Sequence, residues 1–101
     1  MAKWEKICPV DEVPAQSRKL LTLGVWNVLL FNTGKRYFAS SAECPHLGES
    51  LELGELQGII IRCNAHGYQM NLTDGKCLTE AGLNLPTFPV EVREGWIWIK
   101  I

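Results

Sequence analysis

The sequence predicts an all-β domain, built as a small antiparallel sandwich or barrel. Apolar and polar residues alternate along most of the chain, which is the period of a strand. No segment sustains the apolar spacing of an amphipathic helix. Short apolar runs separated by turn residues at close intervals are typical of sandwiches and small barrels. With 101 residues, 47% of them hydrophobic, we expect one domain over residues 1–101 with its own core.

The first half of the chain is predicted to form four strands. Pro9 and Pro14 favour a turn or one short helical turn at Asp11–Ala15. The segment Asn32–Lys35 contains a glycine and polar residues, which favour a turn. The strands between these breaks are predicted at Trp4–Cys8, Arg18–Leu23, Val25–Asn32 and Arg36–Ser40.

The second half is predicted to contain further short strands. The Asp74-Gly75 pair is a hairpin turn signal, and Glu94-Gly95 separates the last two apolar runs. In the last run isoleucine occupies every second position, so three isoleucines should share one face and two tryptophans the other. The strands are predicted at Gln57–Arg62, Tyr68–Asn71, Thr87–Arg93 and Trp96–Ile101.

Two short segments each combine a cysteine with a histidine and then a glycine. They are Cys44-Pro45-His46-Leu47-Gly48 and Cys63-Asn64-Ala65-His66-Gly67-Tyr68, which together read C-x-H-x16-C-x2-H. Thiolates and imidazoles are ligands of iron and zinc. The glycines allow each loop to turn tightly and bring backbone N–H groups close to sulfur. Two such matched loops predict a metal site held by Cys44, His46, Cys63 and His66.

The spacing of these loops resembles that of Rieske-type ferredoxins, in which two Cys hold one iron of a [2Fe–2S] cluster and two His hold the other. The resemblance continues through the Asp-Gly turn, and Leu85–Pro89 is similar to the family's proline loop, which covers the cluster. It implies a Rieske-like antiparallel β-sandwich or small barrel with a cluster-binding subdomain at about residues 40–85. It also implies one cluster per chain, with Cys44 and Cys63 on one iron and His46 and His66 on the other.

The chain differs from the high-potential members of that family at four positions. Those proteins carry an extra cysteine in each loop, joined as a disulfide, where this chain has Glu49 and Ala65. They also carry two hydroxyl donors, where this chain has Tyr68 and Met70. Because lost donors lower the potential of a cluster, the resemblance is to the low-potential bacterial ferredoxins that serve aromatic-ring oxygenases.

Other uses of the cysteines remain open at this point. A Cys2His2 set can hold structural zinc, although zinc sites usually space their cysteines by two to four residues. Cys8 and Cys77 are expected to be small buried hydrophobes, and a disulfide between them is the alternative. A [4Fe–4S] centre on all four cysteines would leave both loop histidines unexplained.

Acidic residues surround the first loop in the sequence. No Lys or Arg occurs between Arg36 and Arg62, whereas four glutamates fall there. This charge could steer a basic partner toward the cluster, or it could be an ordinary solvated rim. The residues expected around the cluster and at the docking rim are Pro45, Leu47, Gly48, Gly67, Tyr68, Pro86, Glu43, Glu49 and Glu52.

The resemblance implies an electron carrier rather than an enzyme. It would receive single electrons from a flavin reductase and pass them to an oxygenase. The chain has no G-x-G-x-x-G fingerprint of a nucleotide-binding reductase. The alternatives are a Rieske module of another redox enzyme, such as an assimilatory nitrite reductase, and a non-catalytic redox or iron sensor.

Charge and hydropathy restrict the partners and the location. A formal net charge of −1 argues against nucleic acid or a membrane surface as a partner. Apolar runs such as Val28–Phe31 are too short to span a bilayer, and the N-terminus lacks the apolar region of a signal peptide. We expect a cytoplasmic monomer.

Overall fold

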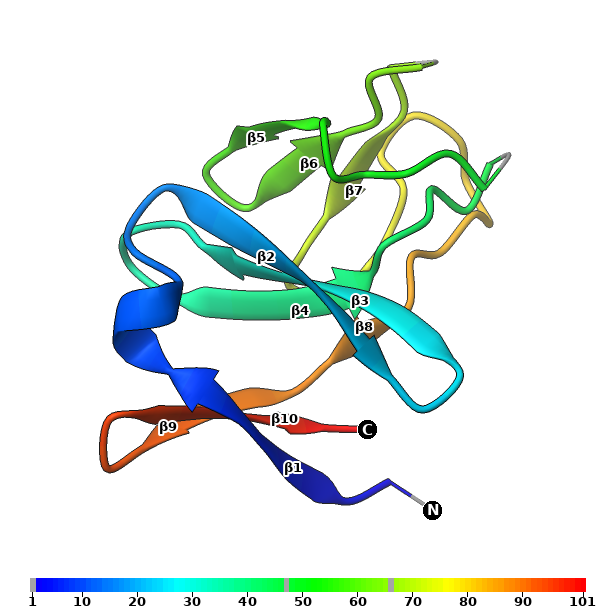
Figure 1. Ribbon diagram of the computed structural model, residues 1–101. Coiled ribbons are helices and arrows are strands. Elements are labelled where there is room, and N and C mark those ends of the chain that lie inside the picture. The colour runs from blue at the N-terminus through cyan, green and yellow to red at the C-terminus, as the bar shows by residue number, and fades with distance from the viewer. Residues whose placement is uncertain (1, 47, 66) are drawn as a thin grey trace.

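A computed structural model describes residues 2–46, 48–65 and 67–101 of the chain. Over these residues the chain forms three antiparallel sheets and one short 3-10 helix, as predicted for an all-β fold (Figure 1). The described residues include no helix that is long and apolar enough to cross a membrane. The elements are β1 (Trp4–Pro9), η1 (Val10–Glu12), β2 (Ser17–Leu23), β3 (Trp26–Asn32), β4 (Tyr37–Ser41), β5 (Glu55–Gln57), β6 (Ile60–Arg62), β7 (Gln69–Asn71), β8 (Thr87–Phe88), β9 (Val90–Arg93) and β10 (Trp96–Lys100).

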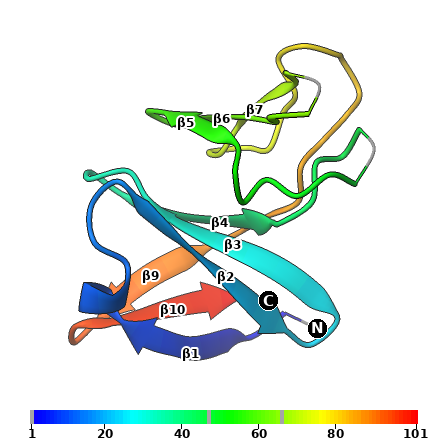
Figure 2. The same ribbon diagram turned by 45° about the horizontal axis from the view of Figure 1, so that its top comes forward.

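The three sheets stack as layers, with the β2–β3–β4–β8 sheet in the middle (Figure 1, Figure 2). The β1–β10–β9 sheet covers its lower face, and the β5–β6–β7 sheet covers its upper face as drawn. Strand β3 is buried on both sides, which explains its continuous apolar run Val28–Phe31. The middle sheet therefore supplies side chains to two separate parts of the core.

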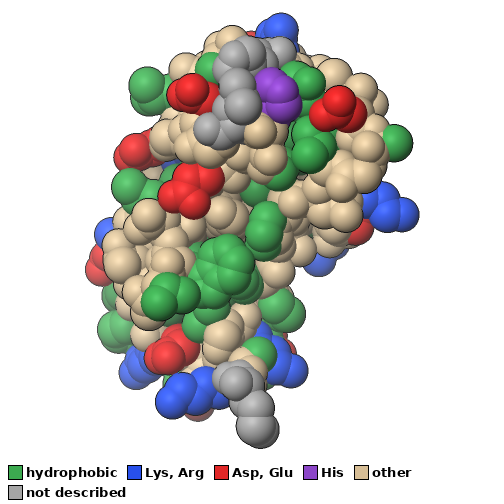
Figure 3. Space-filling view, turned by 90° about the vertical axis from the view of Figure 1, so that its right-hand side faces the viewer, with side chains coloured by type: hydrophobic (Ala, Val, Ile, Leu, Met, Phe, Trp, Pro, Cys, Tyr) green, Lys and Arg blue, Asp and Glu red, His purple; other side chains and the backbone are tan. Residues whose placement is uncertain are grey.

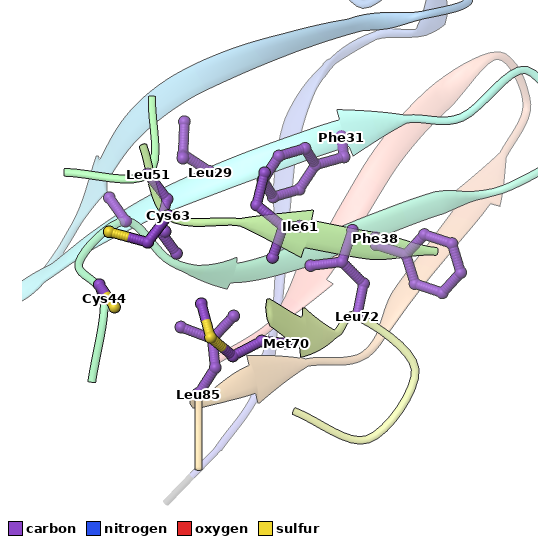
Figure 4. Close-up of a cluster of buried hydrophobic side chains, with 11 residues drawn as sticks. Leu29, Phe31, Phe38, Cys44, Leu51, Ile61, Cys63, Met70, Leu72 and Leu85 are labelled. Atoms are coloured by element: carbon purple, nitrogen blue, oxygen red, sulfur yellow. The ribbon is translucent and has the colours of Figure 1, made fainter. Parts of the chain in front are cut away.

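Two clusters of buried side chains hold the layers together. We call the cluster between the middle and upper sheets the upper cluster (Figure 4) and the other the lower cluster. Alternation along β3 divides its residues, since Leu29 and Phe31 join the upper cluster and Val28 and Leu30 the lower. The upper cluster is Leu29, Phe31, Phe38, Ala42, Cys44, Leu51, Ile61, Cys63, Met70, Leu72 and Leu85. The lower cluster is Cys8, Val13, Val28, Leu30, Ala39, Ile97 and Ile99.

Two predicted strands are wrong because each is divided by a turn residue. The segment Gln57–Arg62 contains the last residue of β5 and the whole of β6. Gly58 turns the chain between these two strands with a φ of +61°. The segment Thr87–Arg93 forms β8 and β9 on either side of Pro89. Because proline has no N–H to give to a ladder, the chain leaves one sheet there, so that β8 pairs with β4 and β9 with β10.

The remaining predicted elements are confirmed with small shifts at their ends. The short helical turn begins at Val10 rather than Asp11. The Asp74-Gly75 turn is present, since the Gly75 N–H donates to the Asn71 carbonyl at 2.7 Å. In β10 the isoleucines at 97 and 99 are fully buried and the tryptophans are half-buried on the other face.

The two cysteines outside the ligand segments lie in different parts of the core. Cys8 is buried in the lower cluster, whereas Cys77 is half-buried against the upper cluster. Both are free thiols. Burial raises the pKa of the Cys8 thiol, with a further rise from Glu12 and an opposing effect of Lys19. Cys8 is therefore an apolar core residue, as predicted, and the separation of the two sites excludes a disulfide between them.

Candidate metal centre

The first ligand segment forms a tight loop closed by two backbone hydrogen bonds. The Cys44 N–H donates to the Glu49 carbonyl (N···O 2.6 Å), and the Gly48 N–H donates to the Cys44 carbonyl (N···O 2.9 Å). A bridge between Glu43 and Ser50 extends the pairing outward. The cysteine therefore sits at the base of a hairpin-like loop. Leu47, expected at the docking rim, lies outside the described residues.

The second ligand segment closes with the same two bonds at the same spacing. The Cys63 N–H donates to the Tyr68 carbonyl (N···O 2.8 Å), and the Gly67 N–H donates to the Cys63 carbonyl (N···O 2.9 Å). This loop joins β6 to β7, with Arg62 paired to Gln69 at its base. The two loops thus share one backbone design. His66 lies outside the described residues.

The glycines of both loops adopt a conformation that other residues rarely take. Gly48 has a φ of +76° and Gly67 a φ of +72°, in the left-handed region where a Cβ is strained. At Gly67 an added Cβ would also lie 3.0 Å from Nη2 of Arg62. The guanidinium of Arg62 therefore lies against the second loop.

The two predicted cysteine ligands are buried at the same end of the upper cluster (Figure 4). Cys44 is 2% exposed and Cys63 1% exposed. His46 is half-buried, and its Nδ1 atom is buried. In the first loop the thiol is therefore deeper than the imidazole, which is the arrangement expected if the histidine side of a bound group lies nearer the surface.

Tyr68 connects the two loops through its ring. The ring stacks on the imidazole of His46, with centroids 4.1 Å apart and planes at 14°. It is half-buried and packs against the upper cluster. Burial raises the pKa of the Tyr68 hydroxyl, and Glu80, Cys77 and Cys44 add to that rise. The hydroxyl is therefore protonated and neutral at physiological pH.

Arg18 supports the chain just after the first loop, and nothing in the sequence distinguished it. Its Nη1 donates to the carbonyls of Leu51 (3.0 Å) and Glu52 (3.2 Å), and its guanidinium lies over the Phe31 ring, 5.3 Å from the centroid. Burial lowers the pKa of Arg18, although Glu52 opposes this effect. The two carbonyls lie 33 and 34 residues away from Arg18 along the chain. No pattern in the sequence around Arg18 could therefore have predicted these hydrogen bonds.

The proline segment is held beside the loops by backbone bonds. The Leu85 N–H donates to the Gly75 carbonyl at 2.7 Å, and the Ser41 N–H donates to the Pro86 carbonyl at 2.9 Å. Leu85 is buried in the upper cluster, and Pro86 is exposed. Gly75 cannot carry a Cβ without overlapping the Leu85 carbonyl oxygen. This contact explains the glycine of the Asp-Gly turn.

Acidic side chains are exposed around the histidine-bearing end of the molecule (Figure 3). The side chains of Glu49 and Glu52 are exposed, as is Glu43, which accepts a hydrogen bond from Asn27 Nδ2 at 3.2 Å. Pro45 is half-buried between Cys44 and His46. The acidic residues predicted for the rim are therefore at the surface.

The donors of the two loops fit a [2Fe–2S] group. Two buried thiols at one end of the core and a half-buried imidazole, on loops of one design, match a cluster that takes Cys on one iron and His on the other. The described residues contain no group of three His, Cys, Asp or Glu side chains that could hold a single metal ion. Cys8 belongs to the lower cluster, which excludes a centre on all four cysteines.

Comparison with known proteins identifies relatives that include a dioxygenase ferredoxin subunit and a nitrite reductase. The profile of the Rieske [2Fe-2S] domain matches residues 3–89. The 3-phenylpropionate/cinnamic acid dioxygenase ferredoxin subunit of Escherichia coli K12 is 32% identical over 97 residues, covering 93% of this chain and 90% of that protein. The nitrite reductase [NAD(P)H] of Emericella nidulans is 31% identical over 101 residues, covering 90% of this chain. The chain spans only 9% of that reductase.

Solved structures share the fold along nearly the whole chain. A chain in the complex of reduced oxygenase and oxidized ferredoxin in carbazole 1,9a-dioxygenase superimposes with a TM-score of 0.85. It is 26% identical, and the match covers 95% of this chain and 91% of that chain. The Sphingomonas yanoikuyae B1 ferredoxin also reaches 0.85 at 22% identity, covering 98% of this chain and 99% of that chain. The second likeness concerns the fold alone.

Proposed function

This chain belongs to the Rieske [2Fe-2S] domain family, and on that premise we propose that it receives single electrons from a flavin-dependent reductase and passes them to an oxygenase. The observation that carries the proposal is the pair of matched loops that bring Cys44 and Cys63 to one end of the core. The ferredoxin subunit of the E. coli dioxygenase, similar over 90% of its length, supports the oxygenase as acceptor.

We assign the ligands as Cys44, His46, Cys63 and His66. A bound [2Fe–2S] cluster supplies one-electron redox chemistry, and imidazole ligands raise its potential above that of a four-cysteine centre. The thiols are buried on the inner side, and the shallower His46 offers a shorter path to the surface than either thiol. The acidic rim orients a basic partner toward that side.

The proposal is tested by metal analysis and EPR of the dithionite-reduced protein. We expect two iron atoms and two acid-labile sulfides per chain, and an average g value below that of an all-cysteine [2Fe–2S] ferredoxin. Stoichiometric zinc without sulfide would refute the assignment.

A second candidate function is a Rieske module of an assimilatory nitrite reductase, favoured by the match to the Emericella enzyme. The two candidates differ in the acceptor. Mixing the reduced protein with a sirohaem nitrite reductase, and separately with an aromatic-ring oxygenase, distinguishes them by the rate of reoxidation. We further propose a cytoplasmic monomer, which sedimentation and cell fractionation test.

The midpoint potential is expected to be low for a Rieske centre, near the bottom of the range of about −150 to +300 mV. The reason is that Met70 has no hydrogen-bond donor and the Tyr68 ring is stacked on His46. The cluster sulfurs therefore accept fewer hydrogen bonds from hydroxyl groups than in the high-potential members of the family. Protein-film voltammetry at neutral pH measures it. A midpoint well above zero would contradict this prediction.

Reversing charge on the acidic rim is expected to slow electron transfer to the oxygenase. Glu49→Lys removes an attractive charge from the approach to the histidine side, so the rate should fall about tenfold at low salt, and the difference should shrink as salt rises. Glu5→Lys is the matched control, because Glu5 is an exposed residue of β1 in the lowest sheet. Equal stopped-flow rates for the two variants would show that the rim is only solvated surface.

A further inference from the structure

Tyr68 is joined to both ligand loops, once through its backbone and once through its ring. Its carbonyl accepts the N–H of Cys63, with an N···O distance of 2.8 Å, which fixes the residue within the second loop. Its ring stacks on His46 of the first loop, 4.1 Å between centroids and 14° between planes. The sequence predicted Tyr68 around the cluster and at the docking rim, and the structure places its ring half-buried against the upper cluster. Its main contact is therefore within the site.

The stack matters because nothing in the covalent structure fixes the plane of an imidazole. The torsion that turns a histidine ring is broad and roughly two-fold, so either nitrogen could face inward. In this structure the Nδ1 atom of His46 is buried. The Tyr68 ring lies nearly parallel to the imidazole. Its own backbone hydrogen bond and its packing against the upper cluster hold it there. It therefore blocks rotation of the imidazole out of that plane.

We propose that Tyr68 is a positioning residue for the cluster: its ring holds the His46 imidazole in the orientation that binds iron, and so links the two ligand loops. This inference rests on the proposed function, since it needs a bound cluster. It assigns the role to the face of the ring and not to the hydroxyl. A phenylalanine at position 68 should therefore serve as well as tyrosine.

Variants of the protein with its bound [2Fe–2S] cluster separate the effect of the flat aromatic ring from that of side-chain volume. Tyr68→Phe keeps the flat ring, whereas Tyr68→Leu keeps apolar volume without it. Tyr68→Met replaces Tyr68→Leu if that variant fails to fold, because its flexible chain fills the same space. Tyr37→Leu is the matched control, because Tyr37 is half-buried but packs against the lower cluster.

The readouts are the EPR spectrum of the reduced protein and the rate at which visible absorbance is lost in the presence of an iron chelator. Tyr68→Phe and Tyr37→Leu should match the wild type in both. Tyr68→Leu should show broadened g values and lose absorbance roughly two- to tenfold faster, the ratio that corresponds to one aromatic stack.

The outcomes separate the inference from the function on which it rests. A wild-type protein without sulfide would overturn both. A wild type that holds the [2Fe–2S] cluster, with a Tyr68→Leu variant that matches it in both readouts, would overturn the positioning role and leave the proposed function standing. A Tyr68→Phe variant that behaves like Tyr68→Leu would also overturn it, since the hydroxyl would then be the active group.

Discussion

Replacing Cys63 with Ala is expected to abolish iron and sulfide binding completely. Cys63 is 1% exposed at the base of the second loop, so water cannot readily take the place of the missing thiolate on the iron. Because cluster binding contributes to folding stability, the melting temperature should also fall to that of the apoprotein. Iron and sulfide analysis of the purified variant, with a thermal melt followed by circular dichroism, measures both effects.

Cys8→Ala is the matched control for this experiment. Cys8 is equally a buried thiol, but it belongs to the lower cluster and lies outside both ligand loops. Its replacement should cost about 1 kcal/mol of unfolding free energy, as for an average point mutation, and leave iron and sulfide at wild-type levels. Full iron and sulfide in Cys63→Ala, or their loss in Cys8→Ala, would overturn the ligand assignment.

Gly75→Ala is expected to lower the free energy of unfolding by about 2–5 kcal/mol. About 1–2 kcal/mol comes from placing a Cβ at a φ of +77°. About 1–3 kcal/mol more comes from relieving the overlap of that Cβ with the Leu85 carbonyl oxygen. Relieving the overlap displaces Leu85, which packs in the upper cluster with Cys44 and Cys63, so the iron–sulfur cluster should also be lost faster to a chelator. Urea unfolding measures the free energy.

Gly95→Ala separates conformational strain from this collision. Gly95 has a φ of +78°, close to that of Gly75, but an added Cβ would have no atom within 4 Å. It should therefore cost only about 1–2 kcal/mol and leave the rate of cluster loss unchanged. If the two alanine variants were equally stable, the contact between Gly75 and the proline segment would have no energetic role.

The strand predictions were correct where the apolar pattern and the turn residues placed the strand ends at the same positions. Strands β2, β3 and β4 lie within one residue of their predicted ends, because turns at Gly24 and Gly34 separate them clearly. The predictions at Gln57–Arg62 and Thr87–Arg93 were wrong. Each segment contains a Gly or Pro next to β-branched residues, and only the strand pairing shows that the chain turns there: Gln57 folds back to pair with Ile60, and the two halves of Thr87–Arg93 pair with different strands.

The sequence by itself determined the chemistry of the site. Cysteine and histidine at this spacing, with a glycine four residues after each cysteine, are local features, because each loop closes on its own backbone. They sufficed to indicate the family, the cofactor class and four candidate ligands. These local features could not show that the two loops share one hydrogen-bond pattern. That pattern depends on the φ angles and on the backbone N···O distances that close each loop, rather than on residue type.

Only the tertiary structure decided which other residues support the loops. Arg18 reaches carbonyls at Leu51 and Glu52, Tyr68 stacks across to His46, and Gly75 lies under the Leu85 carbonyl. Each contact joins segments that are distant along the chain or belong to different loops. Such contacts are set by how the three sheets stack, and a pattern of neighbouring residues contains no information about that packing.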